Sequence, residues 1–483
     1  MGTQTSGAEP HVRAQIRTRA DCIALDAADP LAAMRERFAL PDDVIYLDGN
    51  SLGALPKATA AHVADVIERQ WGGELIASWN NAGWIASPRR VGDALAPLIG
   101  AGDGEVVVAD STSINLFKVL TVAMRLASDG ISNNVARRVV ISEADNFPTD
   151  LYIAEGVLRQ LSDVRADARA DARGAGAELK LVPATASDAR DATIVSALSS
   201  STAVLMLTLV NYRTGAMHDM KALTRAAHDA GALVIWDLAH SAGAVPVDLH
   251  DAAADFAIGC GYKYLNGGPG APAFLWVHPR LVERLVHSHV MQPLSGWMGH
   301  AAPFAFESGY APALGVDRFL CGTPPILSMA ALECGIASLK GLAGTADPMP
   351  ALRAKSIALT GLFIEQVESR CGDALVLATP RDAARRGSQV SFFARGTLAG
   401  QGYALMQALI ECGVIGDFRK GSSDDGGRDC NDHDDAREDI LRFGFAPAYL
   451  RHVDVFDAAE AVGDALVSEA YRDPRFRVRA AVT

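Results

Sequence analysis

Short apolar segments alternate with helical patterns through the middle of this chain. Six of them are rich in Val, Ile, Leu and Phe and almost free of polar residues: residues 106–108, 139–141, 203–209, 233–236, 256–259 and 273–276. These segments are shorter than typical helices, and strands that are apolar at every position are buried on both faces. We therefore expect an α/β fold in which helices cover a mainly parallel sheet on both sides.

The length of the chain predicts two domains, because 483 residues are roughly two to three times the usual length of a single domain. After two prolines at 324–325 the pattern changes to long helices at 330–342 and 357–370, and an apolar strand follows at 390–393. The expected division is an N-terminal segment, residues 1–45, that packs on the small domain, a large domain, residues 46–330, and a smaller C-terminal α+β domain, residues 331–483.

Charge and apolarity exclude two classes of partner. Acidic residues outnumber basic ones by 57 to 44, for a net charge of −13, which disfavours binding to nucleic acid. The longest apolar run, residues 203–210, is interrupted by Thr208 and is too short to span a membrane.

The seven cysteines are scattered, which predicts unpaired thiols in a reducing cytoplasm and no metal site. The N-terminus also lacks the apolar core of a secretion signal.

Polar side chains that can carry chemistry follow the apolar segments. Asp237 comes directly after the strand predicted at 233–236, and His240 follows three residues later. Because ligands of parallel sheets bind at the carboxyl ends of the strands, this pair marks a candidate site. A structural ion pair would give the same pattern.

A single lysine, Lys263, lies between Tyr262 and Tyr264, after the strand predicted at 256–259 and before a glycine-rich turn. In a partly dry pocket the pKa of a lysine falls, and its amine becomes a nucleophile that can form a Schiff base. The alternative is a lysine whose stem packs beside a turn while its amine reaches water.

Two further features suit anionic groups. The hydroxyl cluster at 111–113 (Ser-Thr-Ser) precedes a helical pattern, and it either binds a phosphate or forms an ordinary N-cap. Arg442, flanked by apolar residues, either holds a substrate carboxylate or forms a buried structural ion pair. With Asp237 and Lys263, these are the parts that a pyridoxal-phosphate enzyme requires: a carboxylate for the ring nitrogen, a lysine for the imine and a phosphate site.

At these residues the chain resembles the kynureninase family. The resemblance begins with GYKYLNGGPGAPAF at 261–274, with WDLAHSAGAVPVDLH before it and LSGWMGH after it. It continues, in the same order along the chain, in YLDGNSLGALP, STSINLFKVL, DNFPTDLY, VNYRTGAMHDM, CGTPPI, GVIGDFR and LRFGFAPAY. It therefore covers nearly the whole chain from Tyr46 to Tyr449, and it implies a fold-type I enzyme with a seven-stranded sheet and pyridoxal 5′-phosphate as cofactor.

The resemblance also implies roles for individual residues. Lys263 would bind the cofactor and shuttle the substrate's α-proton, Tyr262 would be its acid–base partner, and Asp237 would hold the pyridinium nitrogen. Arg442 would clamp the substrate's α-carboxylate. The other implied cofactor positions are Thr112 and Ser113, which meet the phosphate together with Tyr262, Phe147, which stacks on the ring, Pro148, Thr149, Asp150, Thr208 and His240, and, from the partner subunit of a homodimer, Trp297 and Thr323.

The implied activity is the hydrolytic Cβ–Cγ cleavage of L-kynurenine to anthranilate and L-alanine, by a cytoplasmic hydrolase of tryptophan catabolism that leads to NAD biosynthesis. The sequence does not distinguish kynurenine from its 3-hydroxylated relative, because one ring hydroxyl is read by a few pocket residues. The alternative is another fold-type I enzyme, an aminotransferase or a cysteine desulfurase with Cys430 as its catalytic thiol. A non-catalytic binding protein of this fold would not be expected to retain Lys263 and Arg442.

Two segments depart from the family pattern without removing a motif residue. Residues 166–176 (ADARADARGAG) lengthen a connection as a surface loop or a helical insertion. Residues 420–439 form a charged, Gly-rich stretch between two of the motifs, which predicts either solvated disorder or a mobile lid.

Overall fold

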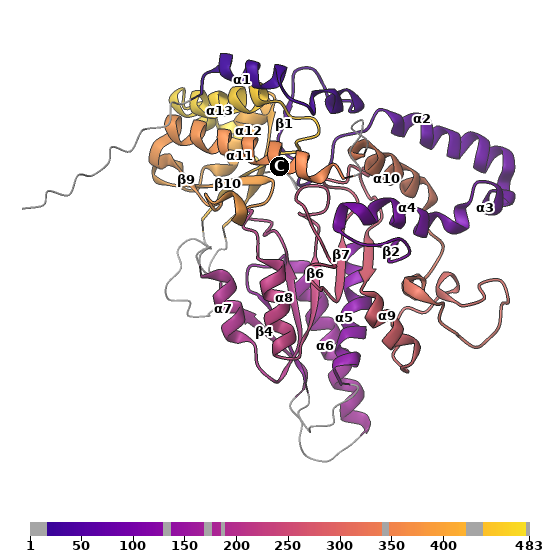
Figure 1. The fold of residues 1–483 in the computed structure, drawn as a ribbon. Helices are drawn as coiled ribbons and strands as arrows, with labels where there is room; N and C mark the ends of the chain where they lie inside the picture. The colour runs from indigo at the N-terminus through magenta and orange to yellow at the C-terminus, as the bar shows by residue number, and fades with distance from the viewer. Residues whose placement is uncertain are drawn as a thin grey trace, which may run out of the picture.

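The computed structural model describes residues 17–128, 137–168, 176–184, 189–340, 347–421 and 438–479 (Figure 1). The segment at 166–176 begins in the last turn of a helix, and its residues 169–175 lie outside the described residues. Most of the segment at 420–439, including Cys430, also lies outside them. Among the described helices, none combines the length and the apolarity that crossing a membrane would require.

A seven-stranded sheet forms the centre of the large domain, in the order β2-β8-β7-β6-β5-β3-β4. Its strands are β2 (Val106–Val108), β3 (Val139–Glu143), β4 (Glu178–Val182), β5 (Thr202–Thr208), β6 (Leu233–Asp237), β7 (Phe256–Gly259) and β8 (Phe274–Val277). Within this described sheet only β8 runs against its neighbours, β2 and β7, so the predicted mainly parallel sheet is confirmed. The apolar segments predicted as strands all form strands, and β4 is an addition.

Helices cover both faces of this sheet, as its apolar strands require. On β6, Val234 and Trp236 face one layer of apolar side chains while Ile235 faces the other. The first layer comes from α4 (Ser87–Leu95), α7 (Arg190–Ala197), α8 (Met220–Asp229) and α10 (Ile326–Leu339). The second comes from α5 (Thr112–Ser128), α6 (Pro148–Ala168) and α9 (Pro279–Val286).

A second, antiparallel sheet lies in the C-terminal part of the chain, in the order β12-β13-β10-β9. Its strands are β9 (Leu375–Leu377), β10 (Gln389–Ala394), β12 (Asp417–Arg419) and β13 (Ile440–Gly444). The accompanying helices are α11 (Met349–Cys371), α12 (Gly402–Glu411) and α13 (His452–Val467). The predicted smaller α+β unit is therefore present.

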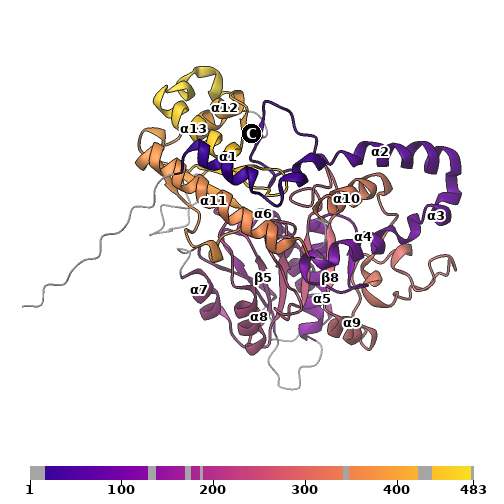
Figure 2. The same cartoon turned by 45° about the horizontal axis from the view of Figure 1, so that its top comes forward.

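The N-terminal part of the described chain packs against this C-terminal unit (Figure 2). Helix α1 (Arg19–Ala27) lies against α13, and the Asp26 carboxylate accepts hydrogen bonds from the backbone N–H groups of His452 and Val453, 2.6 and 2.9 Å away. Strand β1 (Ile45–Tyr46) pairs in parallel with β11 (Val414–Ile415). The next helix, α2 (Ala58–Asp65), continues as a π-helix and leads to the short α3 (Ser78–Asn81).

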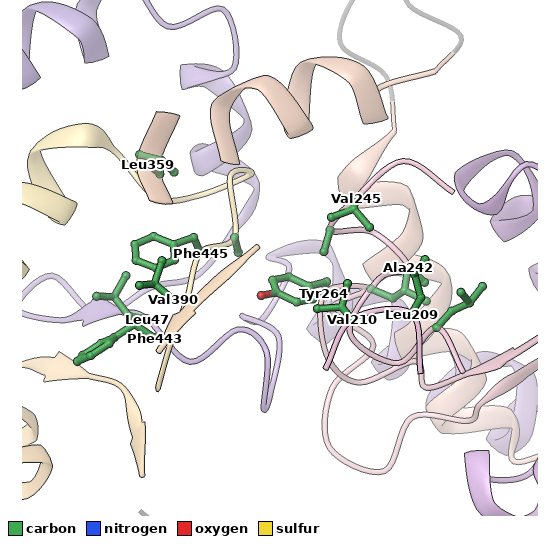
Figure 3. Packing of buried hydrophobic residues seen from close by; sticks show 14 of the residues in the cluster. Leu47, Leu209, Val210, Ala242, Val245, Tyr264, Leu359, Val390, Phe443 and Phe445 are labelled. Carbon is green, nitrogen blue, oxygen red and sulfur yellow. The ribbon is translucent and has the colours of Figure 1, made fainter. Parts of the chain in front are cut away.

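Buried side chains join the two units into one core (Figure 3). Tyr264 lies between Val210 of the large domain and Phe445 of the C-terminal unit, and its hydroxyl donates a 2.7 Å hydrogen bond to the Ser388 carbonyl. Because Tyr264 directly follows Lys263, the loop that carries this lysine is attached to both units.

A buried cluster of charges fixes the carboxyl end of β3. The two ring nitrogens of His218 lie 2.9 Å from the carboxylate of Glu143 and 2.6 Å from that of Asp191. Arg190 bonds both oxygens of Glu143 and continues to Asp145, 3.0 Å away. Burial alone would lower the pKa of His218, but Glu143 and Asp191 outweigh it and raise that pKa above 6.5.

We predict that His218→Gln destabilises the protein by roughly 3 kcal/mol, because it breaks buried ion pairs. Since the folded pKa exceeds the unfolded value of 6.5, the stabilisation is complete below pH 6.5 and is lost as the pH rises through the folded pKa. The loss in the free energy of unfolding, relative to wild type, should therefore be largest below pH 6.5 and become smaller above it. Urea unfolding at a series of pH values measures this difference. Exposed His289 provides the control, His289→Gln. A deficit that grew at high pH would contradict this prediction.

Candidate active site

The carboxyl ends of the parallel strands meet at one edge of the central sheet, and the predicted residues follow them. Thr208 and Asp237 end the paired strands β5 and β6. Lys263 follows β7, Thr112 follows β2, and Phe147 follows β3. The apolar faces of these strands are used for packing, so their polar side chains gather where the strands end.

The Lys263 amine lies 2.9 Å from Nε2 of His240. The loop of Lys263 is shaped by a close backbone approach, because Gly53 donates a 2.8 Å hydrogen bond to the Tyr262 carbonyl. A Cβ atom at position 53 would lie 2.3 Å from the Lys263 carbonyl oxygen, so only glycine fits there. The segment around Gly53 thus supports the lysine from far away in the sequence.

His240 is a neutral imidazole in this pocket. Burial lowers its pKa well below the ordinary range, and the charges of Lys263 and Arg442 lower it further. A neutral ring that accepts at Nε2 carries its proton on Nδ1. That Nδ1 is buried and has no hydrogen-bond partner among the described residues, so the site contains a buried donor that still needs an acceptor.

Two buried carboxyl groups, those of Asp237 and Asp150, are hydrogen-bonded to each other. Burial raises the pKa of both, and the neighbouring Asp237 raises that of Asp150 further. Asp150 therefore retains a proton and donates it in the bond to Asp237, whose other oxygen contact is the backbone N–H of Ala239 at 2.7 Å. Asp237 remains the carboxylate that can meet a cationic ring nitrogen.

Aromatic and hydroxyl groups line the same edge. Phe147 is 43% exposed and packs edge-on against Tyr212, with 5.3 Å between the ring centroids. The Tyr262 ring lies 5.7 Å from the Lys263 amine, and burial raises the pKa of its hydroxyl. Thr208 donates its hydroxyl to the side-chain oxygen of Asn146. Pro148 and Thr149 begin α6 beside them.

The hydroxyl cluster lies at the start of α5, a helix of 17 residues that begins at Thr112. Both Thr112 and Ser113 are partly exposed, and the backbone N–H groups of a first helical turn point outward, where an anion can meet them. The Ser111 hydroxyl accepts a 3.4 Å hydrogen bond from the Ile114 N–H, so the N-cap role is also used.

These residues fit pyridoxal phosphate. The pocket supplies a lysine amine, a buried carboxylate for a cationic nitrogen, a helix start for a phosphate and an exposed aromatic ring for stacking. The unpaired Nδ1–H of His240 is a further sign, since a buried donor without an acceptor normally has one supplied by a ligand or water.

Arg442 projects from β13 toward the same edge and is almost completely buried. Its guanidinium donates to Asp417 on the adjacent strand, to the Tyr212 carbonyl at 2.7 Å and to the Ser51 hydroxyl at 2.8 Å. The ion pair with Asp417 is the buried structural ion pair that the sequence left open as an alternative for Arg442. It fixes the plane of the guanidinium. The bonds to Tyr212 and Ser51 bring it to the junction of three segments.

Trp297 and Thr323 lie apart from this constellation in the single chain. Trp297 packs edge-on against Trp79, with 5.7 Å between their ring centroids, and Thr323 is exposed shortly before α10. Among the described residues, no hydrogen bond or ring contact joins either side chain to Lys263.

Several supporting residues were not singled out from the sequence. Asn146 accepts from both Thr208 and the backbone N–H of Phe147, and Asp417 holds Arg442. Asp417 lies opposite Arg442 in the β12–β13 pair, and its signal in the sequence is one acidic residue in the otherwise apolar run 414–418. Tyr212 acts through its backbone carbonyl, for which a sequence carries no signal.

Comparison with known proteins identifies the family. A family model for the kynureninase C-terminal domain matches residues 352–462. A kynureninase of Burkholderia pseudomallei (strain 1106a) is 52% identical over 97% of this chain and all of its own length. A kynureninase of Pseudomonas fluorescens is 51% identical over 96% of this chain and all of its own length. The chain belongs to the kynureninase family.

Solved structures with the same fold come from more distant proteins. The Escherichia coli cysteine desulfurase CsdA has a TM-score of 0.68 and 20% identity, and the match covers 91% of this chain and 98% of that one. A variant of the lyase C-DES with glycine covalently linked to its PLP cofactor has a TM-score of 0.68 and 15% identity, covering 89% and 98%. The fold is that of the fold-type I enzymes, and the cofactor of this kynureninase-family chain is pyridoxal phosphate.

We predict that Asp417→Ala destabilises the protein by roughly 3 kcal/mol, because it leaves Arg442 buried without its carboxylate. Asp417→Asn retains an acceptor oxygen and should lose less. Equilibrium unfolding in urea measures both, with Asp42→Ala at an exposed position as the control. Equal stability of wild type and Asp417→Ala would show that the pair contributes nothing net.

Proposed function

We propose that this protein hydrolyses L-kynurenine to anthranilate and L-alanine. The reaction breaks the Cβ–Cγ bond, gives the oxygen of water to the new carboxylate of anthranilate, and leaves a proton on Cβ of alanine. The observation that carries the proposal is 52% identity to a kynureninase over 97% of the chain, with Lys263, Asp237 and Arg442 all present. A second candidate, cysteine desulfurization, has support only from structures at 20% identity or less.

The cofactor, when bound, withdraws electrons from the carbon atoms next to the substrate's amine. Asp237 supports that role by holding the ring nitrogen in its protonated form, and the proton retained by Asp150 keeps the second carboxyl neutral. Phe147 would stack on the ring, and Pro148 and Thr149 would border it. The hydroxyls of Thr112 and Ser113, together with Tyr262, would hold the phosphate.

Proton transfer falls to Lys263 and Tyr262. The amine, once free, is held 2.9 Å from neutral His240 and takes the α-proton of the substrate. Burial raises the pKa of the Tyr262 hydroxyl, so this group retains its proton at neutral pH and would donate it to Cβ of the alanine product. Thr208 would act indirectly, by donating to the side-chain oxygen of Asn146, which also accepts from the backbone N–H of Phe147.

Arg442 binds the α-carboxylate of the substrate. Asp417 and the Ser51 hydroxyl accept from one terminal nitrogen of the guanidinium and the Tyr212 carbonyl accepts from the other, so the incoming carboxylate would replace one of the two neutral partners. A planar guanidinium binds a carboxylate through two parallel hydrogen bonds, which sets the substrate's orientation as well as its affinity.

We predict that Lys263→Ala abolishes anthranilate formation, because it removes both the cofactor's anchor and the base. The holoenzyme is mixed with L-kynurenine, anthranilate is followed by its fluorescence, and alanine is measured in parallel. Lys221→Ala, which changes a lysine 62% exposed on its side chain, serves as the matched control. Wild type and Lys221→Ala should form anthranilate and alanine in equal amounts, and Lys263→Ala should form neither.

A yellow wild-type protein that forms no anthranilate would contradict the substrate assignment and retain the cofactor. The same preparation is then tested with 3-hydroxykynurenine and with cysteine, so that sulfide release would favour the desulfurase alternative. Comparing kcat/KM for the two kynurenines decides which of them the pocket prefers.

We propose further that the protein is a homodimer in which Trp297 and Thr323 reach the cofactor of the partner subunit. Large apolar side chains are exposed near them: Ile76 is 79% exposed, Phe306 83% and Leu314 74%. Ring contacts link Trp297 through Phe304 to Phe306, so the exposed patch is continuous with the implied site residue. A patch of this kind marks a protein interface, and a second copy is the partner that would use Trp297.

We predict that Phe306→Asp shifts the protein from dimer to monomer and lowers activity in the same proportion, because each site loses the partner's residues. Sedimentation velocity measures the assembly, and anthranilate release measures the activity. Val467→Asp, at an apolar residue 85% exposed on α13, is the control and should change neither. A monomeric but fully active variant would contradict the shared site.

We also propose that the protein works in the cytoplasm, in the catabolism of tryptophan that leads to NAD. Support comes from the cysteines: Cys22, Cys260, Cys321, Cys334, Cys371 and Cys412 all carry free thiols in the part of the chain that the structure describes.

A further inference from the structure

The turn that leads into the phosphate-binding helix has an unfavourable backbone conformation. Asp110, between β2 and Ser111, has φ +52°, in the left-handed region that glycine favours. Aspartate tolerates this region better than most residues, but the conformation still needs support from its surroundings. The direction of the chain at Asp110 decides where Thr112 and Ser113 lie.

A buried lysine supplies that support. Lys118, in the second turn of α5, has a side chain that is 0% exposed. Its amine donates to the Asp110 carboxylate and, 2.7 Å away, to the carbonyl of Phe319. A lysine amine is costly to bury without partners, so these two acceptors define its position closely.

The backbone around the turn is held by two further hydrogen bonds, one from the residue before β8 and one from α5. The Ala273 N–H donates a 2.9 Å hydrogen bond to the Asp110 carbonyl, and the Asn115 side chain donates one, also 2.9 Å, to the Ala109 carbonyl. Neither bond involves the Asp110 side chain. The ion pair between Lys118 and Asp110 is therefore a separate contact. Through it, the side chain of Lys118 on α5 reaches back to the residue that begins the turn.

We propose that Lys118 is a positioning residue for cofactor binding. By holding Asp110 in its left-handed conformation, it presents the start of α5 to the phosphate of pyridoxal phosphate. This rests on the proposed role of Thr112 and Ser113 at the phosphate, and it adds a residue that touches neither cofactor nor substrate.

The test compares the binding of two cofactor forms to the apoprotein, measured by equilibrium dialysis without substrate. Lys118→Met should raise the Kd for pyridoxal phosphate about tenfold, equal to about 1.4 kcal/mol, because the turn is no longer held. The Kd for pyridoxal, which lacks the phosphate, should be unchanged. An equal loss of affinity for both compounds would indicate general damage to the protein and would overturn the proposal. An unchanged Kd for pyridoxal phosphate would overturn it as well.

A second variant tests the conformational mechanism. In Asp110→Gly/Lys118→Met, glycine adopts the positive φ without an ion pair, so the affinity for pyridoxal phosphate should return to that of wild type. If Lys118→Met fails to fold, this double variant decides alone: normal affinity supports the proposal, and weak affinity overturns it.

The matched control is Lys355→Met. Lys355 is another buried lysine, paired at 2.7 Å with Asp29, and its partner lies in the N-terminal segment. Its loss should lower Tm and leave both dissociation constants unchanged. Ser113→Ala tests the phosphate site itself: if it leaves the preference for the phosphorylated form intact, the proposed role of that hydroxyl fails, whatever Lys118 does.

Discussion

Burial of the central sheet on both faces is the constraint from which the rest of the structure follows. Strands β5, β6 and β7 are apolar along nearly their whole length, so their polar side chains occur where the strands end. Parallel direction puts those ends at one edge, and Asp237 and Lys263 meet there without being near each other in the sequence. The chemistry of the site is thus a product of the way the sheet is packed.

The sequence predicted the parts of the fold that depend on continuous apolar runs. It missed β4, because this edge strand is largely exposed and has no such run. Of the candidate site, it proposed residues whose chemistry is visible in their type, such as Lys263 and Asp237; the structure brings these to one edge of the sheet, and their roles stay predictions. It could not predict that His240 contacts Lys263, or that Asp150 shares a proton with Asp237, because these contacts depend on loop paths after different strands.

Several of the residues that hold the loops around the candidate site are buried and charged, and each is paired with an opposite charge. Asp417 forms an ion pair with Arg442, and Glu143 and Asp191 together raise the pKa of His218. Each pair fixes a loop that borders the site, since Arg442 bonds the Tyr212 carbonyl while the Glu143 cluster lies just before Asn146. A buried charge accepts only a narrow range of positions, which makes such pairs suited to locating backbone segments.

The hydrogen bond from Tyr264 to the Ser388 carbonyl has a mechanical consequence. Any rotation of the C-terminal unit relative to the large domain would pull on the residue next to Lys263. Because that bond lies inside a core shared by both units, the two cannot turn independently without unpacking it. We therefore expect the two units to unfold together, with the backbone around Lys263 held in place until the shared core opens.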